Sequence, residues 1–226
     1  MKKILVFRKD GLLRFVGHLD VMRSFQRAMA RAGLTPAYSQ GFNPHPLMSF
    51  ASPLSLGYTG ENEVMEVILE GEPSDAEVME NLSAQLPAGL TLLSVRTGVG
   101  SKGNAMSKFA AADFEIRSRI LEGNEQNVRD FFAKDEILSE KLGKVRGHKR
   151  TVEVDLKPLI FGWHQEGESL FVRGAGGAEV NFNPELLCNC LFAELGNEDA
   201  SKSIIRKGLL FRKGEEFFPL QDCEEL

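Results

Sequence analysis

The sequence has few of the features that mark a secreted or membrane-bound protein. Its 226 residues include three cysteines, too few for a disulfide framework, and this number fits a reducing cytoplasm. No apolar run is long enough to span a bilayer, and Lys2 and Lys3 are followed by only four apolar residues before charge returns. We therefore expect a cytoplasmic protein without a signal peptide or a membrane anchor.

Motifs for common metals and cofactors are also missing. The sequence contains no CxxC, no HExxH and no phosphate-binding loop, and Gly98-Val99-Gly100 lacks the rest of a dinucleotide fingerprint. Cys188 and Cys190 are two positions apart on a predicted helix, so they cannot face the same ion. The sequence therefore predicts no metal site, no iron–sulfur cluster of its own and no bound cofactor.

Charge is present but unevenly distributed. The net charge of −5 argues against a uniformly basic nucleic-acid binder. Residues 1–31 nevertheless hold eight basic and two acidic side chains, residues 32–60 hold no charge, and residues 61–80 hold eight acidic side chains and no basic one. This separation indicates either a local basic surface that attracts an anionic partner or two ordinary solvated faces.

The hydrophobic patterns of residues 1–98 predict a first α+β domain. Strand-like patterns occur at residues 3–9, 63–69 and 90–95. Apolar side chains recur every three or four positions from about His18 to Ala32, and a capping box at Ser74–Glu77 begins a second helix. With short extended pieces between residues 34 and 58, the order is β-α-β-β-α-β, the split βαβ pattern of a ferredoxin-like domain with an antiparallel sheet.

Two details of this first domain are also predicted from pattern alone. Leu12–Val16, after the turn at Asp10-Gly11, is expected to continue or re-enter the first strand. The core-facing side of the first helix is expected to carry the following apolar side chains: Leu19, Met22, Phe25, Met29 and Ala32.

The remaining residues predict a linker and a second domain. Residues 99–111 are small and rich in glycine, which indicates a linker, and residues 112–226 repeat a similar order of elements. Strands are predicted at 114–120 and 203–211, and helices at 125–134 and after Asn183-Pro184, an N-cap followed by proline. We expect a second ferredoxin-like α+β domain whose middle carries extra extended pieces.

Two segments of the first domain are candidate binding sites. Arg23, Arg27 and Arg31 lie four residues apart on the first helix, so they share one stripe that could contact phosphates. In the second domain, a basic cluster at Lys144–Arg150 could also contact phosphate, although a solvated loop is the better explanation.

The segment Tyr38–Pro46 is uncharged and stiffened by two X-Pro bonds. It presents side chains that can stack on a base or form hydrogen bonds with a ligand: Tyr38, Gln40, Asn43 and His45. The alternative is a turn whose polar groups satisfy its own backbone. His18 is the one candidate catalytic residue, as a general acid or base, and the alternative for it is packing at the end of a helix.

These residues resemble the signature of a known family. The resemblance is carried by four segments: Arg14–Asp20, Arg27–Leu34, Tyr38–Pro46 and Ser49–Gly57. They are similar to the radical SAM-associated proteins, which occur alone or fused behind B12-type radical SAM enzymes. The resemblance implies a radical SAM enzyme as partner, and that enzyme would carry the cluster and the chemistry. Leu47 departs from the pattern, because the family often has Lys or Arg after the His-Pro pair.

Three functional hypotheses follow from the sequence. The first is an accessory protein without catalytic activity of its own, which presents an RNA substrate to a B12-type radical SAM enzyme. The second is a metal-independent RNA-cleaving enzyme that uses His18, by analogy of fold alone. The third is a protein-interaction scaffold in which the acidic residues 61–80 bind a basic partner.

Overall fold

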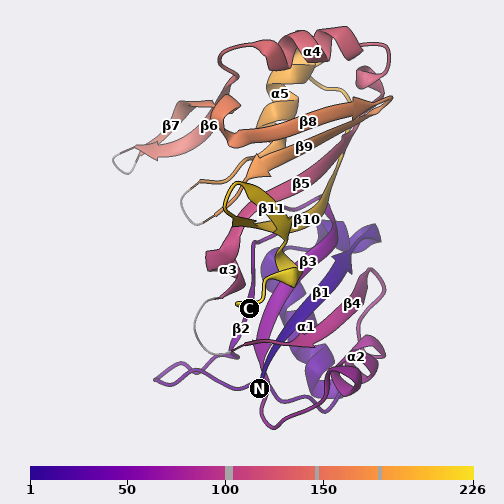
Figure 1. Cartoon of the computed structure of the whole chain (residues 1–226), viewed down its shortest axis with the longest axis vertical. Coiled ribbons are helices and arrows are strands. Elements are labelled where there is room, and N and C mark those ends of the chain that lie inside the picture. The colour runs from indigo at the N-terminus through magenta and orange to yellow at the C-terminus, as the bar shows by residue number, and fades with distance from the viewer. Residues whose placement is uncertain (100–103, 146–147, 178–179) are drawn as a thin grey trace. The chain divides into compact units, whose positions relative to one another are not determined.

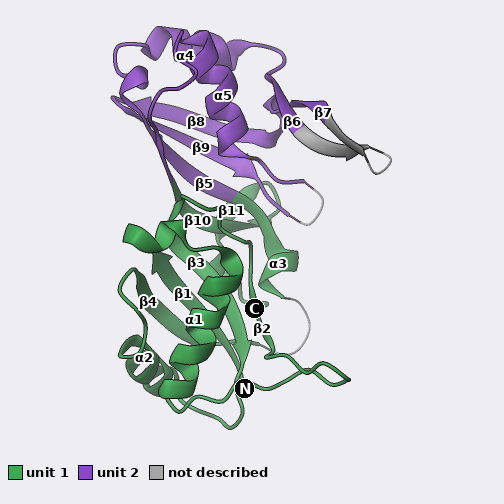
Figure 2. Ribbon diagram, turned by 180° about the vertical axis from the view of Figure 1, so that it is seen from behind, with its two compact units in different colours: residues 1–111, 205–226 green, residues 112–204 purple. Residues whose placement is uncertain are grey.

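The computed structural model describes residues 1–99, 104–145, 148–177 and 180–226, which form two compact units. Unit 1 comprises residues 1–111 and 205–226, and unit 2 comprises residues 112–204 (Figure 2). The predicted α+β class is confirmed. Two ferredoxin-like domains with separate antiparallel sheets are not confirmed, because strands of both units belong to one nine-stranded mixed sheet, in the order β4-β1-β3-β10-β5-β9-β8 with β2 and β11 attached.

Unit 1 contains four strands from the N-terminal part of the chain, with two helices between them (Figure 1). Its elements are β1 (Lys2–Lys9), η1 (Gly11–Phe15), α1 (His18–Arg31), β2 (Met48–Phe50), β3 (Thr59–Ile68), α2 (Asp75–Ser83), β4 (Leu90–Thr97) and α3 (Ala105–Lys108). The order β4-β1-β3-β2 is antiparallel at each step. From the C-terminal part come β10 (Ser203–Lys213), β11 (Glu216–Pro219) and η4 (Leu220–Asp222).

The core of unit 1 lies between this sheet and helices α1 and α2, which cover one face of it (Figure 2). Alternate residues of β3, among them Met65 and Val67, face the helices and are fully buried. Phe25 of α1 meets Phe7 of β1 at a ring-centroid distance of 4.9 Å. The helices begin and end where local chemistry predicts: Ser74 and Glu77 form a complete capping box at the start of α2, and Gly33 follows α1 with φ +70°.

One prediction for unit 1 is wrong, and another is confirmed for four of its five residues. Leu12–Val16 does not extend the first strand, because Gly11 turns the chain at φ +57° and a 3-10 helix follows. Leu12 is 85% exposed there, so its side chain adds nothing to the core. Among the side chains predicted to face the core from α1, Phe25 and Met29 are buried, Met22 and Ala32 are partly buried against the core, and Leu19 is exposed. Val21 and Ala28 complete the buried side of the helix.

Unit 2 contains strands, two helices and a separate two-stranded ribbon. Its elements are β5 (Phe109–Arg117, which begins in unit 1), η2 (Arg119–Leu121), α4 (Glu125–Ala133), β6 (Leu138–Val145), β7 (His148–Asp155), η3 (Lys157–Leu159), β8 (Ile160–Glu166), β9 (Ser169–Ala175) and α5 (Pro184–Glu194). The predicted start of α5 is confirmed, since the Asn183 side chain accepts a hydrogen bond from Glu185 N. The extra extended pieces predicted in the middle are β6 and β7, which pair only with each other.

The predicted linker, residues 99–111, belongs to unit 1. Residues 100–103 lie outside the described part, but Ala105–Lys108 is helical and β5 begins at Phe109. Ala111, which lies in the predicted linker, is buried in β5. Ile205–Leu226, which the sequence placed in the second domain, belongs to unit 1. No helix among the described residues is long and apolar enough to cross a membrane.

Candidate functional site

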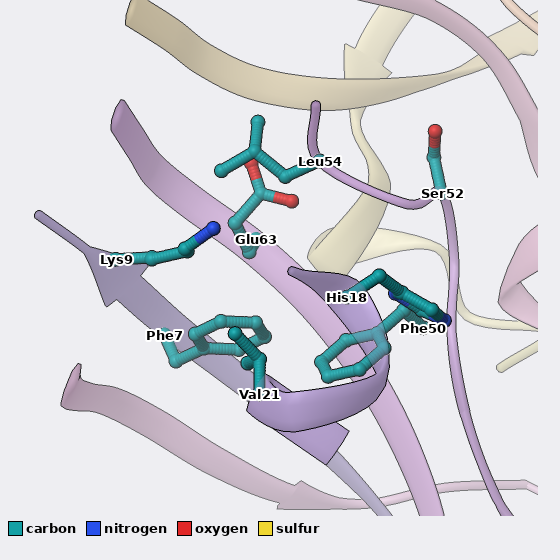
Figure 3. A pocket seen from close by; sticks show the side chains of 8 residues that line it. All are labelled: Phe7, Lys9, His18, Val21, Phe50, Ser52, Leu54 and Glu63. Atoms are coloured by element: carbon teal, nitrogen blue, oxygen red, sulfur yellow. The ribbon is translucent and has the colours of Figure 1, made fainter. Parts of the chain in front are cut away.

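A pocket lies at one end of the unit 1 core, between the start of α1, the ends of β1 and β2, and the start of β3 (Figure 3). Its enclosed space is small, about 20 Å³, which is enough for about one water molecule. Its apolar walls are Phe7, Val21, Phe50 and Leu54. Its polar lining residues are Lys9, His18, Ser52 and Glu63. The pocket therefore combines apolar walls with a small group of charged and polar side chains, as ligand sites usually do.

Strand register places three charged residues around Gly60 at the edge of this pocket. Gly60 pairs with Lys9 of β1 on one side and with Arg206 of β10 on the other. Glu63 bends back over Gly60, where a Cβ atom would come within 2.5 Å of Glu63 Oε1. Gly60 therefore makes room for the Glu63 carboxylate between the two cations. All three charged residues are buried.

Arg206 and Glu63 form a nearly closed set of hydrogen bonds. Arg206 Nε donates to Glu63 Oε1 at 2.9 Å, and its Nη2 donates to the other carboxylate oxygen. The remaining guanidinium donors reach Ser52 O at 2.9 Å, Ser52 Oγ at 3.2 Å and Pro53 O at 3.3 Å. This network fixes the Ser52–Leu54 segment that forms one wall of the pocket. Arg206 has little donor capacity left for a ligand.

Lys9 has far fewer partners than Arg206. Its Nζ donates to Val16 O at 2.8 Å, and within the described residues no ion pair is found for it. Figure 3 shows the Lys9 and Glu63 side chains converging on the same side of the pocket. Burial lowers the pKa of the Lys9 ammonium, the charge of Glu63 opposes that shift, and the charge of Arg206 adds to it. An ammonium has three N–H donors, so Lys9 retains capacity for a ligand.

His18 is the single residue of the predicted binding set that lines this pocket. Its ring packs edge-on against Phe50 at a centroid distance of 4.9 Å. Burial, followed by the charge of Lys9, lowers the pKa of His18, so the ring is neutral near pH 7. In the part of the chain that the structure describes, no hydrogen bond orients either ring nitrogen. His18 is therefore a neutral donor or acceptor at the pocket wall.

The other predicted residues of the Tyr38–Pro46 segment lie on a hairpin before β2, which projects away from the sheet of unit 1 (Figure 1). Ser39 N donates to His45 O at 2.9 Å, and Ser39 Oγ lies 2.8 Å from His45 Nδ1. The hairpin tip leaves Phe42 fully exposed. Tyr38, Gln40, Asn43 and His45 are exposed as well. Both interpretations of this segment therefore have support: it satisfies some of its own polar groups and still presents side chains to solvent.

The three arginines of α1 are exposed, but they are not equivalent. Arg23 Nη1 donates to Asp20 at 2.8 Å, and Arg31 Nη2 donates to the Gln85 carbonyl at 2.6 Å. Arg27 has no hydrogen bond or ion pair with any described residue. Arg27 is therefore the member of the stripe with all of its donors available.

The acidic residues 61–80 do not form one surface. Glu63 and Glu66 are buried, Glu61 pairs with Lys207, and Asp75 pairs with Lys3. Several of the carboxylates that the scaffold hypothesis requires on the surface are therefore buried or paired with lysines within unit 1.

Metal-binding side chains do not cluster within the described residues, where no group of three or more could hold an ion. Burial raises the pKa of Cys188 to about 12, which keeps it a thiol. The predicted basic cluster at Lys144–Arg150 includes residues 146 and 147, which lie outside the described residues.

The sequence analysis did not identify Lys9, Glu63 or Arg206 as site residues. For Lys9 and Glu63, their positions on the core-facing side of a strand could have indicated it. Along β1, Lys9 has the same parity as the buried Leu5 and Phe7; along β3, Glu63 has the same parity as Met65 and Val67. Side chains two residues apart on a strand face the same way, so both charges fall on the core-facing side. Charged residues there are rare unless they are paired or functional.

Comparison with known proteins gives one family match. A family model described as "Uncharacterized protein conserved in bacteria" (DUF2344) matches residues 2–184. A search of curated proteins found no match. The matched region contains the pocket residues of β1, α1, β2 and β3, and the hairpin.

Proposed function

The chain belongs to the bacterial DUF2344 family, and we propose that it is a non-catalytic accessory protein that presents an RNA substrate to a B12-type radical SAM enzyme. The resemblance of Arg14–Asp20, Tyr38–Pro46 and Ser49–Gly57 to radical SAM-associated proteins supports the choice of partner. In this proposal the partner holds the cluster and performs the chemistry.

The observation that carries the proposal is the exposed hairpin. The longest segment of the resemblance, Tyr38–Pro46, directs Phe42 and Tyr38 into solvent, with exposed fractions of 105% and 51%. A segment selected for stability would bury its aromatic rings, because burial of one such ring contributes about 1.5–3 kcal/mol. Exposed aromatic side chains on a hairpin stabilised by its own hydrogen bonds are typical of binding elements.

A second group of exposed apolar side chains supports a protein partner. Gly57 N donates to Arg14 O at 2.7 Å, which joins the segment after β2 to η1. These two neighbouring segments and the first turn of α1 carry four large exposed apolar side chains: Leu12, Phe15, Leu19 and Leu56. Apolar side chains grouped in this way commonly mark a protein-binding surface.

Two features of unit 1 support RNA as the substrate. The order β4-β1-β3-β2, with α1 and α2 on one face, supports a ferredoxin-like interpretation of this unit, an arrangement shared with common RNA-binding modules. Arg27, with its donors available, is placed on α1 where it could contact a phosphate.

We expect the partner enzyme to co-purify with the tagged protein from its own host under anaerobic conditions. Replacing Phe42 with Ser should reduce recovery of a radical SAM enzyme at least about tenfold, since a hot-spot aromatic side chain contributes 2 kcal/mol or more. Lys134→Ser, on an exposed part of unit 2, is the control and should leave recovery unchanged. Consistent absence of such an enzyme from the wild-type complex would contradict the choice of partner.

Binding to host RNA should weaken as salt rises. Arg27→Ala should shallow the slope of log affinity against log salt by about 0.7, the value for one phosphate contact with a single strand. Arg129→Ala, which changes an exposed arginine on α4, is the matched control and should leave the slope unchanged. Salt-independent binding, or none, would argue against RNA.

The same preparation distinguishes the accessory protein from an RNA-cleaving enzyme. Pure protein incubated with host RNA and a chelator should release no specific fragments. Specific cleavage that His18→Ala abolishes while binding persists would overturn the accessory proposal in favour of catalysis by His18.

A further inference from the structure

A second cavity lies in unit 2, between helix α4 and the edge strand β8 (Figure 1). Its volume is about 260 Å³, against about 20 Å³ for the pocket of unit 1. Its lining residues are Glu125, Arg129, Trp163, His164 and Gln165. Among the described strands β8 pairs only with β9, so no further strand of that set covers this edge of the sheet. The cavity is therefore large enough for a small planar molecule.

The indole of Trp163 is held in place by a buried ring. Phe132 of α4 stacks on it at a ring-centroid distance of 4.3 Å, with an angle of 16° between the ring planes. Phe132 is buried, whereas Trp163 is half-buried. The part of the indole that Phe132 does not cover lines the cavity. A fixed and partly exposed aromatic ring of this kind is a platform on which a planar ligand can stack.

Two opposite charges on α4 line the same cavity without pairing. Glu125 and Arg129 are one helical turn apart, in the order and spacing that usually favour an ion pair. Within the described residues neither side chain forms an ion pair, and Arg129 has no hydrogen bond. The Glu125 carboxylate accepts from Gly123 N at 3.2 Å and keeps further lone pairs. The cavity therefore offers a free donor group beside an acceptor group with capacity left.

We propose that this cavity binds a guanine base, stacked on Trp163 with its polar edge toward Glu125 and Arg129. The Watson–Crick edge of guanine carries two adjacent N–H groups, which match the two oxygens of a carboxylate. The next polar atoms around the ring, O6 and N7, are acceptors that a guanidinium binds in a bidentate manner. Adenine, cytosine and uracil lack this order of two donors followed by two acceptors.

The lining favours an uncharged ligand group over a phosphate, because Glu125 opposes the attraction of Arg129 for an anion. A guanine base can come from a free nucleotide or from single-stranded RNA, and both present the same polar edge. The inference therefore does not rest on the accessory function. Because the base is neutral, its contact with Arg129 adds nothing to the salt dependence of RNA binding.

The single tryptophan makes the test direct, because a base stacked on Trp163 quenches its fluorescence. Guanosine and adenosine monophosphates, which carry the same charge, are titrated into the full chain. The guanine nucleotide should bind at least about fivefold more tightly, the discrimination of one base-specific pair of hydrogen bonds. Glu125→Gln should abolish this preference. Asp130→Asn, which changes a carboxylate on the same helix outside the cavity lining, is the matched control and should retain it.

Two short uridine-rich RNAs, one with a central guanosine and one with a central adenosine, distinguish the two sources of the base. Quenching by the guanosine RNA but not by the mononucleotide would identify RNA as the source, and the reverse would identify a free nucleotide. Equal quenching by guanine and adenine probes, quenching by none of them, or a guanine preference that persists in Glu125→Gln would overturn the proposal. Both substituted carboxylates are exposed, so neither variant should fail to fold. The mononucleotide titrations need no partner enzyme and no Arg27, so their outcome is separate from the tests of the accessory function.

Discussion

Replacing Glu63 with Ala is expected to lower the free energy of unfolding of unit 1 by about 3–5 kcal/mol, the usual cost of breaking a buried ion pair. The side chains of Glu63 and Arg206 are 3% and 6% exposed, and both oxygens of the carboxylate accept from the guanidinium. Without Glu63, Arg206 would remain in the interior with only carbonyl and hydroxyl partners. The substitution would therefore lower the free energy of unfolding by more than the loss of two hydrogen bonds, because it also leaves the buried charge of Arg206 without its carboxylate partner.

The measurement must separate the two units. The single tryptophan, Trp163, lies in β8 of unit 2, so its fluorescence reports on that unit. Amide hydrogen exchange in β1 and β3 reports on unit 1. Glu63→Ala should lower protection in β1 and β3 by the stated amount. Glu194→Ala, which removes an exposed ion pair with Lys134, is the control and should cost less than about 1 kcal/mol. Equal effects of the two substitutions would contradict the buried network.

The pair Glu63–Arg206 also shows where prediction from sequence stops. Its members are 143 positions apart, and only the parallel contact of β10 with β3 brings them together. Pattern analysis predicts each strand from its own residues but not which strands pair. The core-facing parity of Glu63 on β3 was visible in the sequence and would have marked it as unusual. Strand parity alone could not have identified Arg206 as the partner of Glu63.

Elements governed by neighbouring residues were predicted well. The capping box at Ser74 and the N-cap at Asn183 depend on side chains within three positions of each other, and both are confirmed. The Leu12–Val16 prediction was wrong because a short apolar run fits a strand or a surface turn equally, and only tertiary packing decides. Ala111 was placed in the linker because small residues are common there, yet a tightly packed strand also selects them.

For the candidate site, the sequence identified His18 and the hairpin but not the charge that faces His18. Lys9 was one of eight basic residues in the first 31, and composition alone gave no reason to separate it from Lys3. The two lysines differ in their hydrogen-bond partners. Lys3 donates to the side chains of Asp75 and Thr97, whereas Lys9 donates to the Val16 carbonyl. Side-chain pairing of this kind depends on the tertiary structure, which is why the pocket became apparent only there.

The pairing of Lys3 with Asp75 predicts a second large effect, on stability and its dependence on pH. Lys3 is fully buried, and its ammonium forms an ion pair with Asp75. Asp75→Ala should therefore lower the free energy of unfolding of unit 1 by about 3 kcal/mol, the lower end of the range for breaking a buried ion pair, because Asp75 itself is 41% exposed. The Thr97 hydroxyl would remain as a side-chain acceptor for the buried amine.

The pH dependence of this effect has a definite sign. Desolvation alone would raise the pKa of Asp75, but hydrogen bonds from Lys3 and Thr97 and the charge of Lys3 outweigh it and lower that pKa. A carboxyl whose pKa is lowered by folding stabilises the native state above its unfolded pKa of about 3.9, and this stabilisation is lost as pH falls through the lower folded value. Asp75→Asn keeps the shape and an acceptor oxygen but cannot titrate.

The difference in unfolding free energy between wild type and Asp75→Asn should therefore be constant from about pH 7 to about pH 5 and shrink below about pH 4. Hydrogen exchange or urea unfolding of unit 1 at a series of pH values measures it. Asp20→Asn, which alters an exposed pair with Arg23 on the same unit, is the control and should show a much smaller change across the series. A difference that stays constant down to about pH 3 would mean that the Asp75 charge does not stabilise unit 1, and that Lys3 is held by its hydrogen bonds alone.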